Sequence, residues 1–286
     1  MSPSPNPHDS KCVSVPARIE RAVARLKSLH DGDTGFLEVV ELGPDAVPAL
    51  RSLLFEPEPS GLHQARGLAA EALAALGAFD VLADFLVSRD PIADPVERLG
   101  EEVVIGAAAR AMARLREEWV YRLLRVLATH RCITGVLAGL GSFYRKDSIE
   151  IFVRALGEDE VRLTAEAILR GFGRAARPTL IEAALDRGAA DRSENESQLR
   201  KRRSALGLLL EIGIPPKKWP ILRTLLEDSD RQIALLACRI CVQLGSARDS
   251  ARAARRLLDL RSGADWLERE RIDDLLKAIT SAASPD

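Results

Sequence analysis

Apolar residues recur along most of this chain at the three- to four-residue spacing of an amphipathic helix. The segment 16–30 shows the pattern, with Ile19, Val23, Leu26 and Leu29 on one helical face. Short turns separate such segments. The chain is 47% hydrophobic but only 4% aromatic, and strands favour the aromatic and β-branched residues. The pattern therefore predicts an all-α protein.

The predicted helices end in a recurring phrase, a leucine or phenylalanine followed by glycine. It occurs in AEALAALG at Gly77, AEAILRGFG at Gly173, ALGLLLEIG at Gly213 and CRICVQLG at Gly245. We expect each glycine to close its helix in the left-handed conformation. Successive glycines lie 40 residues apart (173 to 213) and 32 apart (213 to 245), and the longer interval contains the polar insertion GAADRSENES. A period that changes only by loop insertions is typical of a solenoid.

A second phrase marks the first helix of each pair. Proline stands before a leucine-rich run in 46–55, 176–185 and 219–228. Proline suits the first turn of a helix, where its missing N–H has no intrahelical partner in any case. The two phrases together predict a series of helix pairs.

These phrases resemble the HEAT repeat, in particular the bacterial HEAT-like type first associated with phycobilisome lyases. The resemblance is strongest in 42–54 with 66–77, weakest in 78–143, and extends over 36–280. It implies an α-solenoid, an armadillo-like superhelix of about seven stacked antiparallel helix pairs whose neighbours bury a continuous core. The amphipathic segment 16–30 and the charged DWLERERIDDLLKAIT segment are expected to cap the two ends. We predict one solenoid domain over 16–280, with disordered tails at 1–15 and 281–286.

Charge and targeting signals limit the classes of partner. Lysine and arginine total 41 against 42 acidic residues, for a formal net charge of −1, so the whole chain has no attraction to nucleic acid or anionic membrane. The N-terminus lacks the layout of a signal peptide, and no apolar stretch approaches the roughly 18 residues of a membrane helix. These absences predict a cytoplasmic protein without membrane contact.

Motifs for catalysis are lacking in the sequence. It contains no nucleophile elbow, phosphate loop or dinucleotide fingerprint, and its four histidines are scattered. Cys238-x-x-Cys241 falls on apolar helix positions, which favours core packing over chemistry. Zinc would require two further ligands. We therefore predict no catalytic residue, no metal site and no cofactor.

Three arginines occupy equivalent positions near the starts of second helices: Arg66, Arg162 and Arg202. The HEAT resemblance implies a structural ladder in which such arginines tie neighbouring repeats to acidic turn residues. A structural role is favoured over ligand binding for all three.

A basic cluster, Arg200-Lys201-Arg202-Arg203, is the most distinctive polar feature. The resemblance implies that second helices line the concave face, and the cluster lies in such a helix. A positive groove there would suit phosphates or an acidic protein surface. The competing interpretation is a solvated helix face that nearby acids neutralise. The candidate contact residues are Arg200, Arg203, Lys217, Lys218, Arg239 and Gln243.

The leading functional hypothesis is a non-catalytic scaffold or adaptor. It would bind another protein across the concave face and a rim of loops at 56–63, 88–100 and 187–197. The alternative is a nucleic-acid-binding protein that uses the basic C-terminal half, including the alkylated-base glycosylases of one HEAT-like lineage. A chromophore lyase subunit, suggested by the name of the repeat subtype, is the third hypothesis.

Overall fold

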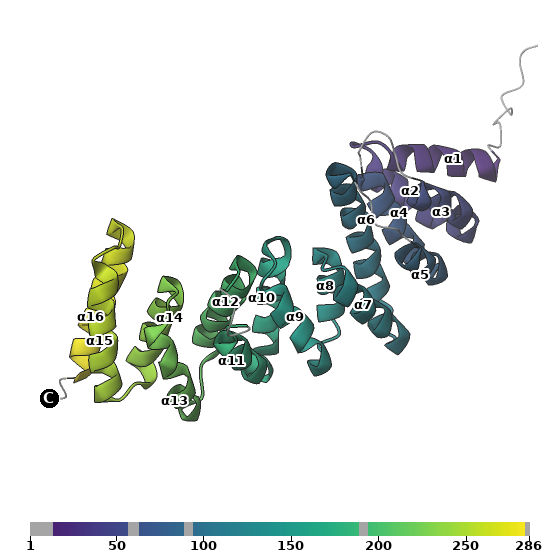
Figure 1. Cartoon of the computed structure of the whole chain (residues 1–286). Helices are drawn as coiled ribbons and strands as arrows, with labels where there is room; N and C mark the ends of the chain where they lie inside the picture. The colour runs from purple at the N-terminus through teal and green to yellow at the C-terminus, as the bar shows by residue number, and fades with distance from the viewer. Residues whose placement is uncertain (1–13, 57–62, 89–93, 189–193, 284–286) are drawn as a thin grey trace, which may run out of the picture. The chain divides into compact units, whose positions relative to one another are not determined.

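The computed structural model describes residues 14–56, 63–88, 94–188 and 194–283, and these ranges contain helices and turns but no strand (Figure 1). The all-α solenoid prediction is confirmed. The chain divides into two compact units. One comprises the residues up to Leu127 together with Ala138–Phe143, and the other comprises Ala128–Leu137 together with the residues from Tyr144 onward. The single domain expected over 16–280 stays a prediction.

The first unit consists of helix pairs in chain order. The segment that we expected to act as a cap is helix α1, and it forms a pair of its own with α2. The boundary between the units passes through the fourth pair. The four pairs are α1 (Val15–Leu26) with α2 (Gly32–Leu42), α3 (Val47–Phe55) with α4 (Gln64–Ala75), α5 (Phe79–Val87) with α6 (Pro95–Ala113), and α7 (Glu118–His130) with α8 (Thr134–Gly141).

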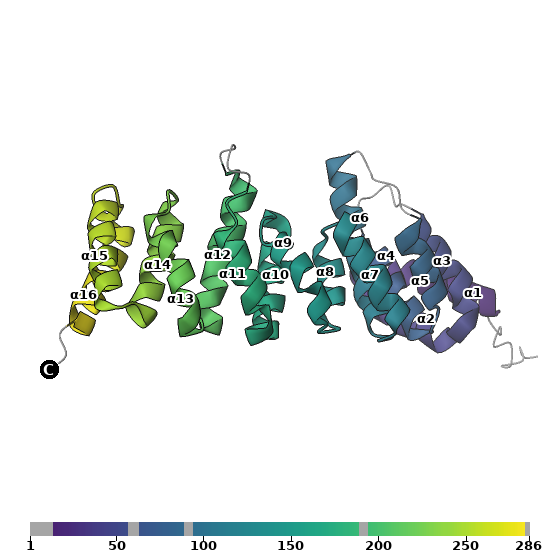
Figure 2. The same cartoon turned by 60° about the horizontal axis from the view of Figure 1, so that its bottom comes forward.

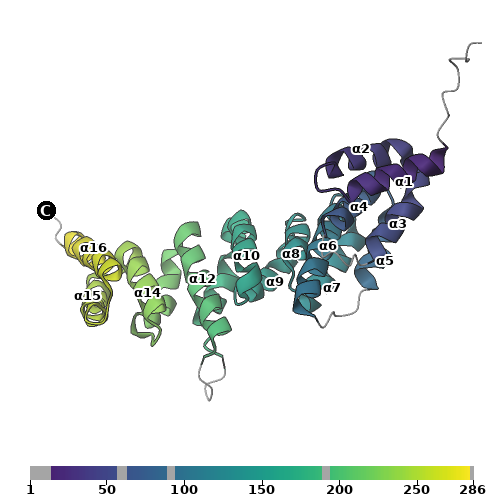
Figure 3. The ribbon, with the colours of Figure 1, turned by 90° about the horizontal axis from the view of Figure 1, so that it is seen from above.

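The second unit continues the same arrangement, and Figure 2 shows its pairs following one another in chain order. Consecutive second helices pack on one another, α10 on α12, α12 on α14, and α14 on α16. Figure 3 shows α10 and α16 on one side of the unit, with their first helices α9 and α15 on the other. The pairs are α9 (Ile149–Ala155) with α10 (Asp159–Phe172), α11 (Arg177–Leu185) with α12 (Glu196–Ile212), α13 (Trp219–Leu222) with α14 (Arg231–Leu244), and α15 (Ala247–Arg261) with α16 (Trp266–Ala283).

The proline phrases begin first helices as predicted. Pro48, Pro178 and Pro220 lie in the first turns of α3, α11 and α13, and each helix follows a short 3-10 turn. The predicted helix 219–228 is only partly α-helical, because it continues after Leu222 as the 3-10 helix Arg223–Glu227.

The terminal glycines follow the prediction at three of four positions. Gly77, Gly173 and Gly213 have φ of 75°, 53° and 83°, a backbone region that costs glycine little. Gly245 has φ of −75°, so the left-handed conformation expected there is wrong. A Cβ atom on Gly245 would lie 2.5 Å from the Cys241 sulfur. Glycine is therefore required at this position by close packing and not by φ.

Two further expectations change in detail. The loop expected over 88–100 is shorter, because α6 begins at Pro95 after an N-cap in which the Asp94 carboxylate accepts hydrogen bonds from two backbone N–H groups, each 2.9 Å long. Helix α1 starts at Val15 within the predicted tail 1–15, and α16 extends to Ala283. The rest of both predicted tails, like parts of the three predicted rim loops, lies outside the described residues.

Candidate functional site

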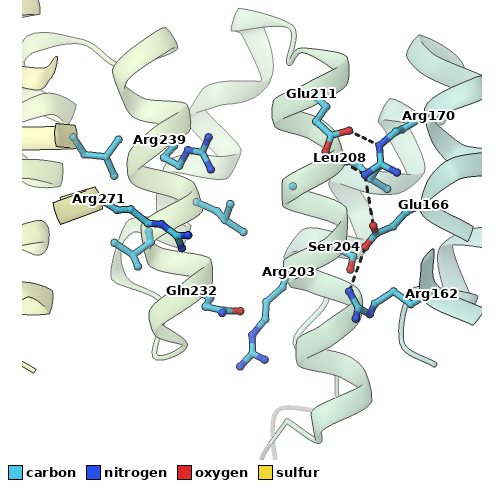
Figure 4. Close-up of a pocket in the computed structure, with 14 residues that line it drawn as sticks. Arg162, Glu166, Arg170, Arg203, Ser204, Leu208, Glu211, Gln232, Arg239 and Arg271 are labelled. Atoms are coloured by element: carbon cyan, nitrogen blue, oxygen red, sulfur yellow. Dashed lines mark hydrogen bonds and ion pairs between the residues drawn. The ribbon is translucent and has the colours of Figure 1, made fainter. Parts of the chain in front are cut away.

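The second helices of four consecutive pairs in the second unit line a groove of about 370 Å³ (Figure 4). Its floor is apolar. Leu208 is buried, while Leu235, Leu236 and Leu275 are half-buried and keep part of their surface open to the groove. Polar side chains from α10, α12, α14 and α16 surround this floor, five of them arginines: Arg162, Arg170, Arg203, Arg239 and Arg271.

Helical periodicity explains why α14 contributes two of the four floor leucines. Its apolar residues Ile233, Ala237 and Ile240 are buried in the core. Residues at the intervening positions face the groove in the order Gln232, Leu235, Leu236 and Arg239, because side chains three, four and seven apart share a helical face. The groove is thus built on rigid helices and not on loops.

The arginines on the α10 side of the groove are paired with acids. The Arg170 guanidinium donates two hydrogen bonds to Glu211, of 2.5 and 3.2 Å. Glu166 lies 3.6 Å from Arg170 and 3.7 Å from Arg162. The hydrogen bond from Arg170 lowers the pKa of Glu211 from its usual range, so this carboxylate stays charged. These residues neutralise one another across α10 and α12.

Arg203 is also committed to neighbouring acids. Its guanidinium donates hydrogen bonds of 2.5 and 3.2 Å to Asp230 and one of 3.2 Å to Glu196. Burial alone would raise the pKa of Asp230, but hydrogen bonds from Arg203 and from the backbone N–H of Ile233 outweigh it and lower that pKa. Asp230 is also the N-cap of α14. Arg203 therefore helps to position α14, which contributes Leu235 and Leu236 to the groove floor.

Arg239 and Arg271 differ from the other three arginines of the groove. Both are exposed, and in the described part of the chain neither side chain makes a hydrogen bond or ion pair. The exposed amide of Gln232 is likewise without a partner there. In Figure 4 the Arg271 side chain extends from α16 toward α14, where Gln232 and Arg239 lie. The uncompensated positive charge of the groove is thus at its α14–α16 end.

The predicted contact residues fall in several places. Arg203 and Arg239 line the groove. Arg200 lines a separate cavity of about 400 Å³ and lies 3.3 Å from Asp159. The other three lie outside the groove lining: Lys217 and Lys218 in the 3-10 turn before α13, and Gln243 exposed near the end of α14.

All four members of the basic cluster form ion pairs. Arg200 pairs with Asp159 and Glu196, and Lys201 pairs with Asp186 at 2.9 Å. Arg202 and Arg203 have the acidic partners Glu194, Asp228, Asp230 and Glu196. The cluster therefore contributes little uncompensated charge, as the competing interpretation of a neutralised helix face expects.

Sequence reasoning missed Arg271 and the leucines of the floor. The last segment was expected to cap the solenoid, whereas α16 is the second helix of a pair with α15. Its i, i+4 pair Arg271 and Leu275 faces the groove, while Ile272 and Ile279 are buried. Assigning 266–283 as one more second helix would have indicated this face.

Two of the three ladder candidates share a geometry. Arg66 is buried and donates from Nε to the carbonyl of Leu54 in its own pair, at 2.9 Å, and from both Nη atoms to Glu101 in the next pair. Arg202 is buried and donates from Nε to Ala184 in its own pair, at 3.0 Å, and from Nη2 to Asp228 at 2.5 Å, beyond the next first helix.

Arg162 differs from these two arginines. It is a third exposed, and its acidic neighbours Asp159 and Glu166, each 3.7 Å away, belong to its own helix. Its guanidinium also lines the groove. Among the described residues, the ion pairs of Arg162 therefore lie within α10 and do not join two helix pairs.

The two cysteines of the CxxC motif lie inside α14. Both are buried, and burial raises the pKa of Cys238 to about 12 and that of Cys241 to about 11. Such thiols are weak nucleophiles and weak metal ligands at neutral pH. Among the described residues no group of three or more histidine, cysteine or acidic side chains is arranged to hold a metal ion. No described helix has the length and apolar character needed to cross a membrane.

No protein-family model matches the sequence, and no curated protein matches it significantly. Among the solved structures that are similar to it, two illustrate how low the similarity is. The complex of CpcE and CpcF of phycocyanin lyase from Nostoc sp. PCC7120 has 19% identity and a TM-score of 0.35, covering 98% of this chain and 100% of that chain. An engineered protein has 16% identity and a TM-score of 0.31, covering 93% and 90%. The fold assignment rests on the helix pairs described above.

Proposed function

We propose that this protein is a non-catalytic scaffold or adaptor that binds another protein through the groove lined by α10, α12, α14 and α16. The observation that carries the proposal is the α14–α16 end of the groove. There, partly exposed leucines adjoin two arginines that have no acidic partner in the described structure. Protein interfaces combine an apolar centre with arginine more often than other surfaces do.

The ion pairs of the groove favour a protein partner over nucleic acid. Binding to a phosphate backbone relies on several free cations, each of which displaces counterions. Here Arg162, Arg170 and Arg203 already have acidic partners, and Glu166 and Glu211 add negative charge to the lining. Two free arginines beside an apolar floor suit a side-chain contact better than a row of phosphates.

Partner capture by charge-reversed variants tests the proposal. The R239E/R271E variant reverses the charge at the α14–α16 end of the groove. We expect it to lose a partner that the wild-type protein retains from an extract of its host. The matched control is R248E/R255E on α15, a first helix. It reverses two exposed arginines that have no ion-pair partner among the described residues. Equal capture by both variants, with far-UV circular dichroism unchanged, would remove the groove as the contact surface.

The predicted contact residues outside the groove need a separate variant. If the contact extends beyond the groove, K217E/K218E reduces capture by the same assay. If the groove alone makes the contact, this variant behaves as wild type. The result decides whether the turn before α13 belongs to the proposed surface.

Nucleic-acid binding is tested directly by fluorescence anisotropy. We expect no binding of mixed-sequence DNA or RNA across about 50 to 300 mM salt. Tight binding that weakens steeply with salt would replace the proposed function with the alternative one, and R239E/R271E would then show whether the groove is the binding surface.

We propose a structural role for Arg66 and Arg202. Each joins a carbonyl of its own pair to a buried carboxylate of the next pair. The Arg202 tie holds α12 in register with the pair that contains α14, and both helices line the groove. The Arg66 tie joins two pairs of the first unit.

A further inference from the structure

The unpaired arginines restrict which segment of a partner can occupy the groove. Arg239 and Arg271 border the same floor as Leu235, Leu236 and Leu275. Any side chain that covers these leucines therefore removes water from the two guanidinium groups as well. Dehydrating a charged group is unfavourable unless an opposite charge replaces the lost water. A neutral or basic segment would leave both charges uncompensated.

The ion pairs within the groove lining further limit where the carboxylates of a ligand can bind. The other three arginines of the groove have acidic partners within 2.5 to 3.7 Å, so an incoming acid gains little by competing for them. Carboxylates of a ligand are directed instead to Arg239 and Arg271, whose planar guanidinium groups match a carboxylate with two parallel hydrogen bonds. Recognition of charge is thereby confined to the α14–α16 end.

The apolar floor requires a second element in the ligand. A purely acidic ligand has no apolar surface with which to cover the three half-buried leucines. The hydrophobic contribution to binding is proportional to the apolar area removed from water. The groove volume of about 370 Å³ is near the lower end of the roughly 300 to 1,000 Å³ of ligand pockets. It therefore suits a few side chains of a short segment and not a broad domain face.

The side-chain amide of Gln232 can form hydrogen bonds with a peptide backbone. Its exposed amide, which has no partner in the described structure, both donates and accepts hydrogen bonds and so matches a backbone N–H or C=O group. It lines the same groove as Arg271 and lies on the same helix as Arg239 (Figure 4). Backbone recognition by this amide would leave the two arginines to recognise side chains.

We propose that the groove binds a short acidic, amphipathic peptide segment of the partner. Carboxylate side chains of the segment pair with Arg239 and Arg271, and an aliphatic or aromatic side chain between them covers Leu235, Leu236 and Leu275. This assignment rests on the proposed function and names the chemistry of its partner.

Three labelled peptides of equal length test the assignment by fluorescence anisotropy on the full-length protein. The first contains glutamate and leucine, the second replaces glutamate by glutamine, and the third replaces leucine by serine. We expect the first to bind, and each of the others to bind at least about tenfold more weakly. Equal binding of the glutamine peptide would show that charge is not recognised, and equal binding of the serine peptide would show that the floor is not used. Either result overturns the assignment.

Variants of the protein locate the contact. We expect R239Q/R271Q to weaken binding of the first peptide at least about tenfold, whereas R248Q/R255Q on α15 leaves it unchanged. The R239E/R271E variant is expected to prefer a peptide of lysine and leucine, an outcome that simple unfolding would not produce. Unchanged binding by R239Q/R271Q overturns the assignment of the groove.

The two proposals fail separately. If R239E/R271E loses its native partner but no acidic peptide binds the wild-type protein, the ligand chemistry is wrong and the proposed function stands. If the acidic peptide binds in the groove but partner capture is indifferent to R239E/R271E, the proposed function is wrong and the peptide site stands.

Discussion

Replacing Asp228 by alanine tests whether buried ion pairs hold neighbouring helix pairs together. Asp228 has no exposed surface. Its Oδ2 accepts hydrogen bonds from Arg202 at 2.5 Å and from Arg187 at 2.7 Å, and its Oδ1 accepts one from the backbone N–H of Asp230 at 2.9 Å. The carboxylate thus joins α12 to the turn before α14. Alanine removes all three interactions and leaves the fully buried Arg202 with one acidic partner, Glu194.

The expected loss of stability is about 4 kcal/mol. Removing one partner of a buried ion pair costs roughly 3 to 5 kcal/mol because the remaining charge is uncompensated. Because Glu194 still pairs with Arg202 at 2.7 Å, we take the lower end of this range, about 3 kcal/mol, for the loss of the ion pairs of Asp228. The Asp230 N–H loses its acceptor, which adds about 1 kcal/mol. This loss is large beside the roughly 5 to 15 kcal/mol that stabilise a typical protein.

Urea unfolding followed by far-UV circular dichroism measures the change. The control is Glu227→Ala, the preceding residue, whose ion pair with Arg252 at 2.8 Å is half exposed on both sides and is expected to contribute at most about 1 kcal/mol. Amide hydrogen exchange should show the lost protection in α12 and α14, since each helix pair contacts mainly its neighbours. A loss for D228A no larger than that for E227A would refute the structural role of Arg202 and its partners.

Two further predictions concern groups buried in the second unit. The indole N–H of Trp219 donates to Asp249 at 3.0 Å, which with Ser246 lowers the pKa of that carboxyl. A lowered acid pKa gives stability that is present above the unfolded pKa of about 4 and is lost as pH falls through the folded value. When the free energy of unfolding is measured from about pH 7 to pH 3, it should therefore fall less in W219F than in wild type. An equal fall in both proteins would contradict this assignment. The thiols of Cys238 and Cys241, with pKa raised by burial to about 12 and about 11, should react with a thiol reagent at neutral pH only after unfolding. Peptide mapping checks this, and equal labelling rates with and without urea would contradict it.

The sequence by itself determined the helix pairs, because the signals that define them are local. Proline in the first turn, as at Pro178, and a left-handed glycine, as at Gly213, act through their own backbone geometry. Apolar spacing then identified positions such as Cys238 as buried without knowledge of what covers them. Gly245 shows the limit, since its requirement comes from the close approach of Cys241 and not from its own φ.

Only the tertiary structure decided which charges are free. The basic run at 200–203 stands out in the sequence, yet each of its members forms an ion pair. Arg203, for example, pairs with Asp230, which lies 27 residues further along the chain. Arg271 stands among acids in the sequence, yet beside the apolar floor it has no acidic partner in the described structure. Whether a charge is compensated depends on distances between side chains from different helix pairs. Stacking sets these distances, and no local pattern records them.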